Sequence, residues 1–290
     1  MTSTIREFAH LQIPLEDILK VTNNFDDRNI IGKGDFGKVY KGQLLLSGKS
    51  VKIAARRLDR KYQQGVIEFW TEISVLSILR HENLVFVIGF CDEKNEKIII
   101  KQRCAKGSLL MHINKERLTW IQRLKICVGV SRALSYIHNE VGRSYSVVHR
   151  NINSSTILLD NKFVPRLSGF EYSVKYPVYK KEELLLLGAI GTTGYIDPAI
   201  PKTGGVNYKS DIYSFGVVLW EILCGRMLLF QMWKRMVPKS RTSFSEVAYS
   251  CLKDERVHRP DMNSILLELE NALELQLPHE QLVRSLFSLF

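Results

Sequence analysis

The chain has 290 residues, 45% of them apolar and 24% charged, which is typical of a soluble globular protein with one large domain or two lobes. Its net charge of +11 comes from basic residues spread along the chain. Without a long basic run and interleaved aromatic residues, we expect no nucleic-acid partner.

The first third of the chain alternates between helical and extended patterns. A helix is expected within residues 12–27, where Pro14 precedes Leu15 and the acidic Glu16 and Asp17 favour a helix N-terminus. Strands are predicted within residues 30–53, 84–90 and 97–103, and a helix over residues 65–80.

After Gly107 the pattern becomes mostly helical, with helices predicted over residues 120–138, 212–223 and 261–275. A strand-rich third followed by a helix-rich remainder predicts an α+β fold of two lobes, with a hinge near residues 102–107. The predicted divisions are a flanking segment with a helix at 1–27, an N-lobe at 28–104, a C-lobe at 105–275 and a C-terminal tail at 276–290.

Membrane and disulfide signals are lacking in the sequence. No apolar run reaches the roughly 18 residues that span a bilayer, and Thr2 stands where myristoylation needs glycine, so we expect no direct membrane insertion. The cysteines have no paired spacing and predict buried thiols in a reducing compartment, with no zinc site: Cys91, Cys104, Cys127, Cys224 and Cys251.

A glycine-rich segment fits the spacing G-x-G-x-x-G-x-V at Gly32, Gly34, Gly37 and Val39. Dinucleotide-binding folds share this spacing, and an ordinary glycine-rich hairpin also fits it. A dinucleotide fold would begin a helix here, whereas this chain continues in an extended pattern. That favours a hairpin over nucleotide phosphates, because glycine lets the backbone approach anionic oxygens closely.

Further motifs resemble the cytoplasmic domains of plant receptor-like kinases. They are L-R-H-E-N-L-V at 79–85, G-F-C at 89–91, L-T-W and R-L-K-I within 118–126, G-T-T-G-Y-I-D-P at 191–198 and S-D-I-Y-S-F-G-V at 210–217. The resemblance covers about residues 14–275 and points to the receptor kinases with malectin-like ectodomains. It implies a bilobal protein-kinase fold, with a small strand-rich N-lobe containing one main helix and a larger helical C-lobe.

Two motifs that carry the chemistry of this family are degenerate. Residues 149–156 resemble the catalytic loop H-R-D-x-x-x-x-N, with Asn151 in place of the catalytic Asp and Thr156 in place of the metal-binding Asn. At the D-F-G motif, Gly169 replaces the metal-binding Asp and Glu171 replaces the flexible Gly. We expect Glu171 to face away from the site, since it is displaced by two residues.

The phosphate anchor of the family is altered as well. Arg56 stands where V-A-I-K ends in the phosphate-binding Lys, and Glu72 matches the helix Glu that pairs with it. Lys101 falls at the position just before the hinge. The favoured reading is that its amine reaches solvent; the alternative is that it points toward Glu72 and partly replaces the missing Lys.

Other positions match the residues that hold the family's fold together. His149, Phe170, Leu76 and Val87 match the apolar spine between the lobes, Val39, Ala54 and Leu158 match the residues around adenine, and Asp211 matches the Asp that braces the catalytic loop. Ordinary core packing is compatible with all of these positions.

The chain also departs from the family pattern further downstream. Ala199 stands where a Glu should pair with Arg259, which predicts an unpaired Arg259 and a less anchored activation segment. The stretch between residues 226 and 244 has fewer residues than the family norm. It corresponds to the helix G region, where partners often dock. Arg150 is a candidate for binding a phosphate on Thr192 or Thr193.

These losses predict a protein that keeps the kinase body without its chemistry. Magnesium prefers anionic oxygen, which neither Gly169 nor Thr156 supplies, and Asn151 cannot act as a base. With Arg56, Lys101 and Arg150 in a more positive cleft, weak ATP binding without magnesium is an open expectation.

The leading hypothesis is a pseudokinase that acts as a scaffold, decoy or allosteric partner of an active receptor-like kinase or immune receptor. It would be cytoplasmic or peripheral at the plasma membrane through that partner, with its oligomeric state open. A low-activity atypical serine/threonine kinase is the alternative, and a decayed duplicate is a third reading.

Overall fold

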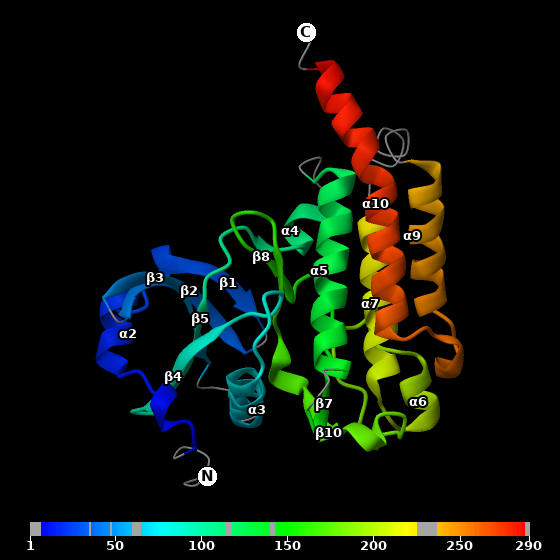
Figure 1. Ribbon diagram of the computed structural model, residues 1–290. Helices are drawn as coiled ribbons and strands as arrows, with labels where there is room; N and C mark the ends of the chain where they lie inside the picture. Colours follow the sequence, from blue (N-terminus) through cyan, green and yellow to red (C-terminus); the bar gives the residue numbers. More distant parts are fainter. Residues whose placement is uncertain are drawn as a thin grey trace.

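A computed structural model shows a strand-rich N-lobe beside a larger helical C-lobe, as the α+β prediction required (Figure 1). The structure describes residues 7–34, 36–46, 48–59, 65–113, 118–139, 143–224 and 237–287, and the side chains of the last helix as far as His279. The expectation about the shortened stretch at 226–244 falls mostly on residues 225–236, outside the described ranges.

The N-lobe is built on an antiparallel sheet in the order β1-β2-β3-β5-β4. Its strands are β1 (Ile30–Gly34), β2 (Gly37–Leu46), β3 (Lys49–Leu58), β4 (Val87–Glu93) and β5 (Glu96–Gln102). The helices α2 (Leu15–Thr22) and α3 (Gly65–Ile78) pack against it. The short 3₁₀ helices η1 (Ala9–Leu11) and η2 (Asp27–Asn29) contact β4 and β2, respectively. The predicted strands and helices of this lobe are confirmed, although β4 begins at Val87 rather than at residue 84.

The two faces of the sheet are covered by different helices, because successive strand residues point to opposite sides. Ile98 and Ile100 of β5 share a core with α2, whereas Ile99 between them belongs to the core that contains α3. In the register of β3 with β5, Arg56 lies opposite Ile99 and Ala54 lies opposite Lys101. Arg56 and Lys101 therefore share the α3 side of the sheet.

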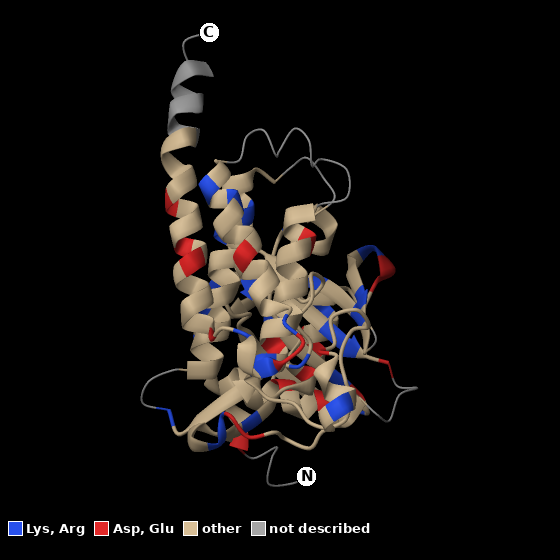
Figure 2. Cartoon of the chain, turned by 90° about the vertical axis from the view of Figure 1, so that its right-hand side faces the viewer, with Lys and Arg blue, Asp and Glu red and all other residues tan. Residues whose placement is uncertain are grey.

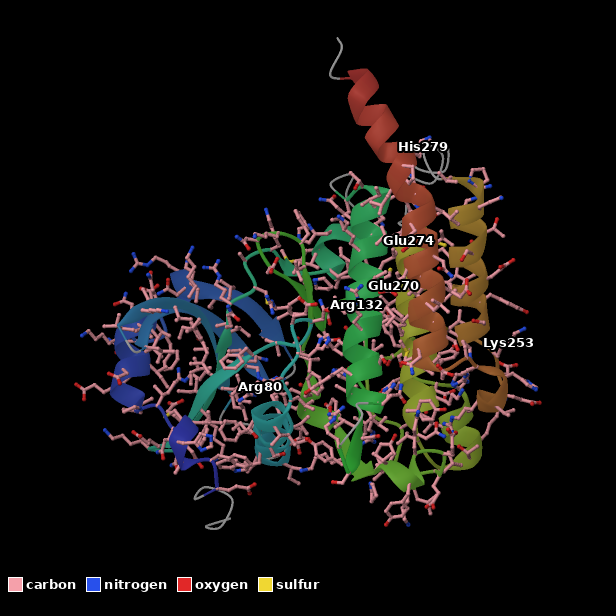
Figure 3. The ribbon with its side chains drawn as sticks, in the orientation of Figure 1. Arg80, Arg132, Lys253, Glu270, Glu274 and His279 are labelled. Atoms are coloured by element: carbon pink, nitrogen blue, oxygen red, sulfur yellow. The ribbon has the colours of Figure 1, made fainter. Side chains whose placement is uncertain are left out.

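The C-lobe is organised around the buried helix α5 (Trp120–Asn139). The other α-helices are α4 (Leu110–Ile113), α6 (Ala199–Thr203), α7 (Tyr208–Cys224), α9 (Pro238–Cys251) and α10 (Met262–Phe287). The strands are β6 (Gly107–Ser108), β7 (Tyr145–Val148), β8 (Ile157–Leu159), β9 (Pro165–Leu167) and β10 (Val174–Pro177). Short 3₁₀ helices are η3 (Phe170–Tyr172), η4 (Val178–Lys180) and η5 (Arg256–His258). An ion pair between Arg132 and Glu270 at 2.6 Å joins α5 to α10 (Figure 3).

Helix α10 is longer than the predicted 261–275 and continues past the packed lobe (Figure 1). Gln276, just beyond the predicted end, is buried, and its Oε1 accepts a hydrogen bond from the backbone N–H of Val237 at 2.9 Å. Burial of this polar side chain explains why apolar periodicity did not extend the predicted helix far enough.

The predicted contacts between the lobes are present. His149, Phe170, Leu76 and Val87 are all buried, and the His149 and Phe170 rings meet edge to face with their centroids 4.4 Å apart. Burial lowers the pKa of His149 to about 4, so its ring is neutral at pH 7. Asp211 braces the loop by accepting hydrogen bonds from the backbone N–H groups of His149 and Arg150 at 2.7 and 2.8 Å.

Charged side chains and cysteines are spread over both lobes. In the view of Figure 2, Lys and Arg are interspersed with Asp and Glu rather than gathered in one place. All five cysteines are free, and Cys91, Cys127 and Cys251 are buried as predicted, but Cys104 is only partly buried and Cys224 is exposed. None of the described helices combines the length and apolar character that crossing a bilayer requires.

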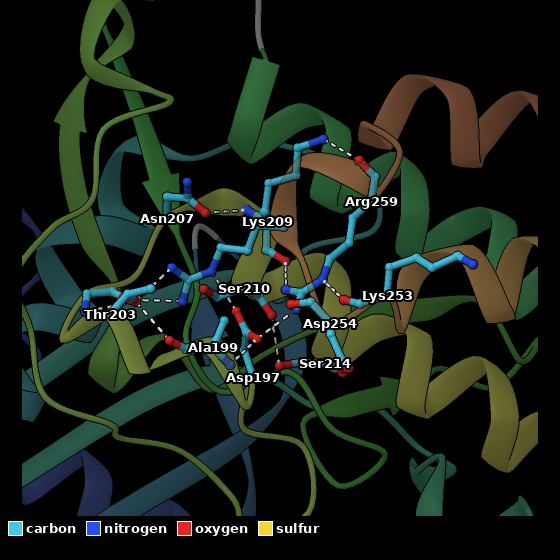
Figure 4. Close-up of polar contacts among 12 residues, drawn as sticks. Asp197, Ala199, Thr203, Asn207, Lys209, Ser210, Ser214, Lys253, Asp254 and Arg259 are labelled. Carbon is cyan, nitrogen blue, oxygen red and sulfur yellow. Dashed lines mark hydrogen bonds and ion pairs between the residues drawn. The ribbon is translucent and has the colours of Figure 1, made fainter. Parts of the chain in front are cut away.

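The prediction of an unpaired Arg259 is wrong (Figure 4). Asp197 lies two residues before Ala199. Its Oδ1 accepts a hydrogen bond from Arg259 Nη2 and its Oδ2 accepts one from Arg256 Nε, each at 2.8 Å. Burial by itself would raise the pKa of Asp197, but hydrogen bonds from Arg259, the Ala199 N–H and Arg256 outweigh it and lower the pKa. The activation segment is thus anchored by a different carboxylate from the one that the motif comparison considered.

We predict that Asp197→Asn lowers the free energy of unfolding by roughly 3 kcal/mol, because two arginines then face a neutral amide in a buried site. The pKa of Asp197 is lowered in the folded protein. The contribution of its carboxylate to the free energy of unfolding is therefore present above the ordinary Asp pKa of about 3.9 and is lost as pH falls below it. Urea denaturation at pH 7 measures the loss. The exposed Glu255 supplies a control, and Glu255→Gln should change stability by less than about 0.5 kcal/mol. Equal effects of the two variants would contradict the anchoring role.

Candidate functional site

A cavity of about 460 Å³ lies between the β1–β2 hairpin and the loops that contain the degenerate motifs. The predicted site residues that line it are Gly32, Gly34, Val39, Ala54, Arg56, Lys101, Asn151, Thr156, Leu158 and Gly169, and Glu171 lines it as well. Glu72 and Gly37 are not among the lining residues. Gly37 lies on β2. It has φ +127°, and a Cβ there would lie 2.1 Å from the Arg57 carbonyl oxygen, so this glycine allows the hairpin to approach β3.

Glu72, which is completely buried on α3, binds two cations at the inner end of the cavity. Arg56 Nη2 donates to Glu72 Oε2, and Lys101 Nζ donates to Glu72 Oε1 at 2.9 Å. The side chains of both cations are only 11% exposed. The predicted Arg56–Glu72 pair is confirmed. The favoured reading that Lys101 reaches solvent is wrong, and the alternative, in which it points toward Glu72, is correct.

The charge state of Glu72 follows from these contacts. Burial by itself would raise the pKa of this carboxyl, but the charges of Arg56 and Lys101 outweigh burial and hold the pKa below its ordinary value. Glu72 is therefore ionised at neutral pH. Glu72 thus has two cationic partners, Arg56 and Lys101, where a simple exchange of Lys for Arg at position 56 would give it one.

The expectation that Glu171 faces elsewhere is also wrong. Its side chain is 7% exposed and lines the cavity, where Oε1 accepts a hydrogen bond from Asn151 Nδ2 at 3.1 Å and Oε2 lies 3.7 Å from Arg56 Nη1. Burial raises the pKa of Glu171, with the Arg56 charge opposing the shift. The four charged groups Arg56, Lys101, Glu72 and Glu171 form two positive and two negative charges when ionised. When Glu171 is ionised, the inner end of the cleft is thus less positive than predicted.

A polar network fills the region around Asn151. The Thr192 hydroxyl donates to Asn151 Oδ1 at 3.0 Å, and Asn153 Nδ2 lies 3.1 Å from Asn151 Oδ1 and 3.0 Å from Thr192 Oγ1. Asn153 also accepts from the backbone N–H of Ser155 at 2.8 Å. Sequence reasoning missed Asn153, although its place two residues after Asn151 was a signal to consider. The amides of this network position the loop without a charge.

Thr156 and Gly169 are matched in shape. The Thr156 hydroxyl lies 3.0 Å from the carbonyl oxygens of Asn151 and Asn153, so its hydrogen is used within the loop. Gly169 has φ +88°, and a Cβ there would lie 2.6 Å from Thr156 Cγ2. A side chain at position 169 therefore conflicts with the Thr156 methyl group as well as with the backbone conformation.

Arg150, the candidate phosphate ligand, makes contacts to the backbone. It donates from Nη1 to the Tyr172 carbonyl oxygen at 3.2 Å and from Nη2 to the Gly188 carbonyl oxygen at 2.8 Å. These bonds connect the catalytic loop with the following segment. Phosphate binding by Arg150 stays a prediction, and it would require the guanidinium to give up or share these bonds.

The residues present do not fit a magnesium site of the kind that the family uses. Gly169 has no ligand atom, the Thr156 hydroxyl is used by the loop, and Glu171 is the sole carboxylate among the described lining residues. No group of three or more His, Cys, Asp or Glu side chains with metal-binding geometry occurs in the described part of the chain. The apolar end is different, because Val39, Ala54 and Leu158 line the cavity and suit a flat heteroaromatic ring.

Comparison with known proteins places this geometry in context. Residues 26–269 match the family model of protein tyrosine and serine/threonine kinases. The chain is 37% identical to the receptor-like protein kinase HERK 1 of Arabidopsis thaliana, and 36% identical to FERONIA and to THESEUS 1 of the same organism. These alignments cover 94%, 90% and 90% of this chain but 36%, 32% and 34% of the three relatives, so the chain spans about a third of their length.

Because Arg56 and Lys101 share Glu72 as their partner, we predict that the effects of replacing them on the free energy of unfolding are strongly coupled. Arg56→Met or Lys101→Met alone leaves Glu72 one partner, whereas the double variant buries a carboxylate with no cation. We expect the double variant to lose about 2 kcal/mol more stability than the sum of the single losses, measured by urea denaturation. The same pair of changes in a Glu72→Gln background should be additive, and additivity with Glu72 present would contradict the shared-partner arrangement.

The match between Thr156 and Gly169 gives a second prediction. Gly169→Ala should lower the free energy of unfolding by about 1–3 kcal/mol, through the steric conflict and the positive φ. Adding Thr156→Ser removes the conflicting methyl group and keeps the hydroxyl, so part of the loss should be recovered. Gly188→Ala, where a Cβ meets nothing within 4 Å, is the control and should have little effect. Failure of Thr156→Ser to restore any stability would show that the methyl contact is unimportant.

Proposed function

The chain belongs to the protein tyrosine and serine/threonine kinase family and is homologous to receptor-like kinases of Arabidopsis thaliana, and we propose that it is a pseudokinase. In this proposal the kinase fold carries no appreciable phosphotransfer activity. It acts as a signalling scaffold, decoy or allosteric partner, and its cleft takes ligands without magnesium.

One observation carries the proposal: Glu171 is the sole carboxylate among the described residues that line the cleft, and it is engaged by Asn151 and Arg56. Phosphoryl transfer depends on metal ions that neutralise the phosphates and on a residue that accepts the substrate proton. The amide of Asn151 cannot accept that proton, and loss of a general base costs roughly 10²–10⁴ in rate. Gly169 and Thr156 do not replace the missing metal ligands.

The contacts around the degenerate positions favour a maintained scaffold over a decayed duplicate. Asp211 still braces the catalytic loop, Glu72 is paired twice, and Asp197 compensates for the Glu that Ala199 does not supply. Decay would be expected to leave buried charges without partners, which is strongly destabilising. Here the principal buried charges of the cleft and activation segment have partners.

Nucleotide binding without metal is part of the proposal. The residues Val39, Ala54 and Leu158 would hold the base, and Arg56 would be the cation nearest to the phosphates. Binding of the phosphates through Arg56 would be electrostatic and would weaken as the salt concentration rises. Magnesium is expected to add little to this binding, since the cleft lacks its usual ligand set.

We further propose that the partner is an active receptor-like kinase or an immune receptor protein. The relatives are named as receptor-like protein kinases, and the chain corresponds to about a third of their length. Attachment to such a receptor would place this cytoplasmic protein at the plasma membrane. The C-lobe has exposed aromatic side chains that such contacts could use, for example Tyr179 in η4 and Tyr249 in α9.

A low-activity kinase is the second candidate, and the position of Glu171 favours it to a limited extent. This carboxylate faces the cavity, so it could bind a metal ion after release from Arg56. That release would leave Arg56 paired with Glu72 alone. The competing contacts make this candidate the weaker one.

Phosphotransfer by the purified protein tests the proposal. We predict no phosphate on the protein after incubation with ATP and either magnesium or manganese, as measured by mass spectrometry, because the base and both metal ligands are replaced. The single variants Asn151→Asp and Gly169→Asp should also stay inactive, since each restores one group of a set. An active receptor-like kinase domain in the same assay is the positive control.

Autophosphorylation by the wild-type protein that disappears in Arg56→Met would overturn the pseudokinase proposal in favour of the second candidate. The same activity surviving in Arg56→Met would indicate a contaminating kinase, and repeating the assay after further purification would remove it.

A further inference from the structure

Glu171 occupies the part of the cavity where an anionic ligand would meet Arg56. The carboxylate is 7% exposed, Asn151 holds its Oε1 at 3.1 Å, and its Oε2 lies 3.7 Å from Arg56 Nη1. Neither Glu171 Oε2 nor Arg56 Nε has a hydrogen-bond partner among the described residues. The two unpaired atoms show that this contact is looser than the Arg56–Glu72 and Lys101–Glu72 pairs.

The charges around this point decide which ligands can enter. Burial raises the pKa of Glu171, and the Arg56 charge beside it opposes this shift and favours the carboxylate. When Glu171 is ionised, Arg56 and Lys101 are balanced by Glu72 and Glu171, and both carboxylates are almost fully buried. A phosphate that approached Arg56 would meet the Glu171 carboxylate beside the same guanidinium. At a separation of about 4 Å in a partly buried site, two like charges repel much more strongly than they do in water. Lys33 also lines the cavity, but it is exposed, so solvent screens its charge.

The apolar part of the lining carries no such penalty. Val39, Ala54 and Leu158 are apolar and line the same cavity, where they could contact a base. A neutral ligand with a flat heteroaromatic ring could use these contacts and leave the Arg56–Glu171 pair intact. A triphosphate would need to separate that pair first.

We propose that Glu171 is an internal competitor for Arg56 that weakens phosphate binding in the cleft, so that the cavity prefers uncharged nucleoside-like ligands to nucleoside triphosphates. This inference rests on the proposed function, because it concerns a kinase cleft that works without metal. Asn151 is a positioning residue in this arrangement. Its amide donates to Glu171. An ionised aspartate at the same position has no hydrogen to donate and would place two carboxylates side by side.

The test compares three ligands in calcium- and magnesium-free buffer containing a chelator: adenosine, ATP and inorganic tripolyphosphate. Affinities are measured by isothermal titration calorimetry for the wild-type protein and for Glu171→Gln, which keeps the shape of the side chain and removes its charge. We expect Glu171→Gln to bind ATP and tripolyphosphate at least about tenfold more tightly than the wild type, because one close repulsion is removed. Adenosine affinity should stay within about twofold.

A matched variant separates this local effect from a change in net charge. Glu183→Gln removes one negative charge at a side chain that is 60% exposed and outside the cavity lining. It should leave all three affinities near their wild-type values. Combining Arg56→Met with Glu171→Gln should abolish the gain for ATP and tripolyphosphate, since Arg56 is the group that Glu171 is proposed to block.

The outcomes that overturn the inference are specific. Unchanged ATP affinity in Glu171→Gln, an equal gain for adenosine, an equal gain in Glu183→Gln, or no binding of any ligand by any variant would each contradict it. Thermal unfolding shows whether Glu171→Gln is folded, and Glu171→Ala serves as the second variant if it is not. Phosphotransfer by the wild-type protein is a separate measurement, which would overturn the pseudokinase proposal while these affinities still decided the role of Glu171.

Discussion

The buried carboxylate of Glu72 is the constraint on which the cleft depends. An ionised group with 0% exposure is stable only when its charge is matched nearby, and two cations, Arg56 and Lys101, provide the match. Because both cations come from the sheet and Glu72 comes from α3, the pairing holds the helix against the sheet. The inner wall of the cavity is then defined by charges within the protein, with no metal or nucleotide required to balance them.

Periodicity in the sequence predicted most of the fold, and it contained more information than the prediction used. Ile98 and Ile100 belong to one core and Ile99 to the other, so the residue at 101 must share the side of Ile99. Strand alternation thus pointed Lys101 toward α3. The general tendency of long cationic side chains to reach water was given more weight, and here a buried carboxylate within 2.9 Å outweighed it.

Other features could not be predicted, because they depend on segments that are distant in sequence. The pairing of Asp197 with Arg256 and Arg259 joins residues 59 and 62 positions apart, and the Asn151–Glu171 bond closes a loop of 20 positions. Comparison of motifs assigns a role to a position, whereas an ion pair needs only a charge at the right point in space. A neighbouring residue in the motif can therefore supply what the expected residue lacks.

The altered positions of the cleft depend on one another, and this argues against independent losses. The Thr156 methyl group fits because Gly169 has no Cβ, and Glu171 is held because position 151 carries an amide rather than a second carboxylate. An aspartate restored at 151 or at 169 would therefore meet a repulsion or a steric conflict that the present residues avoid. Within the cluster of Arg56, Lys101, Glu72 and Glu171, the buried atoms without a hydrogen-bond partner are Arg56 Nε and Glu171 Oε2, although Oε2 lies 3.7 Å from Arg56 Nη1. The cleft is thus internally balanced except at this contact, which makes it the point where a ligand could most readily change the arrangement.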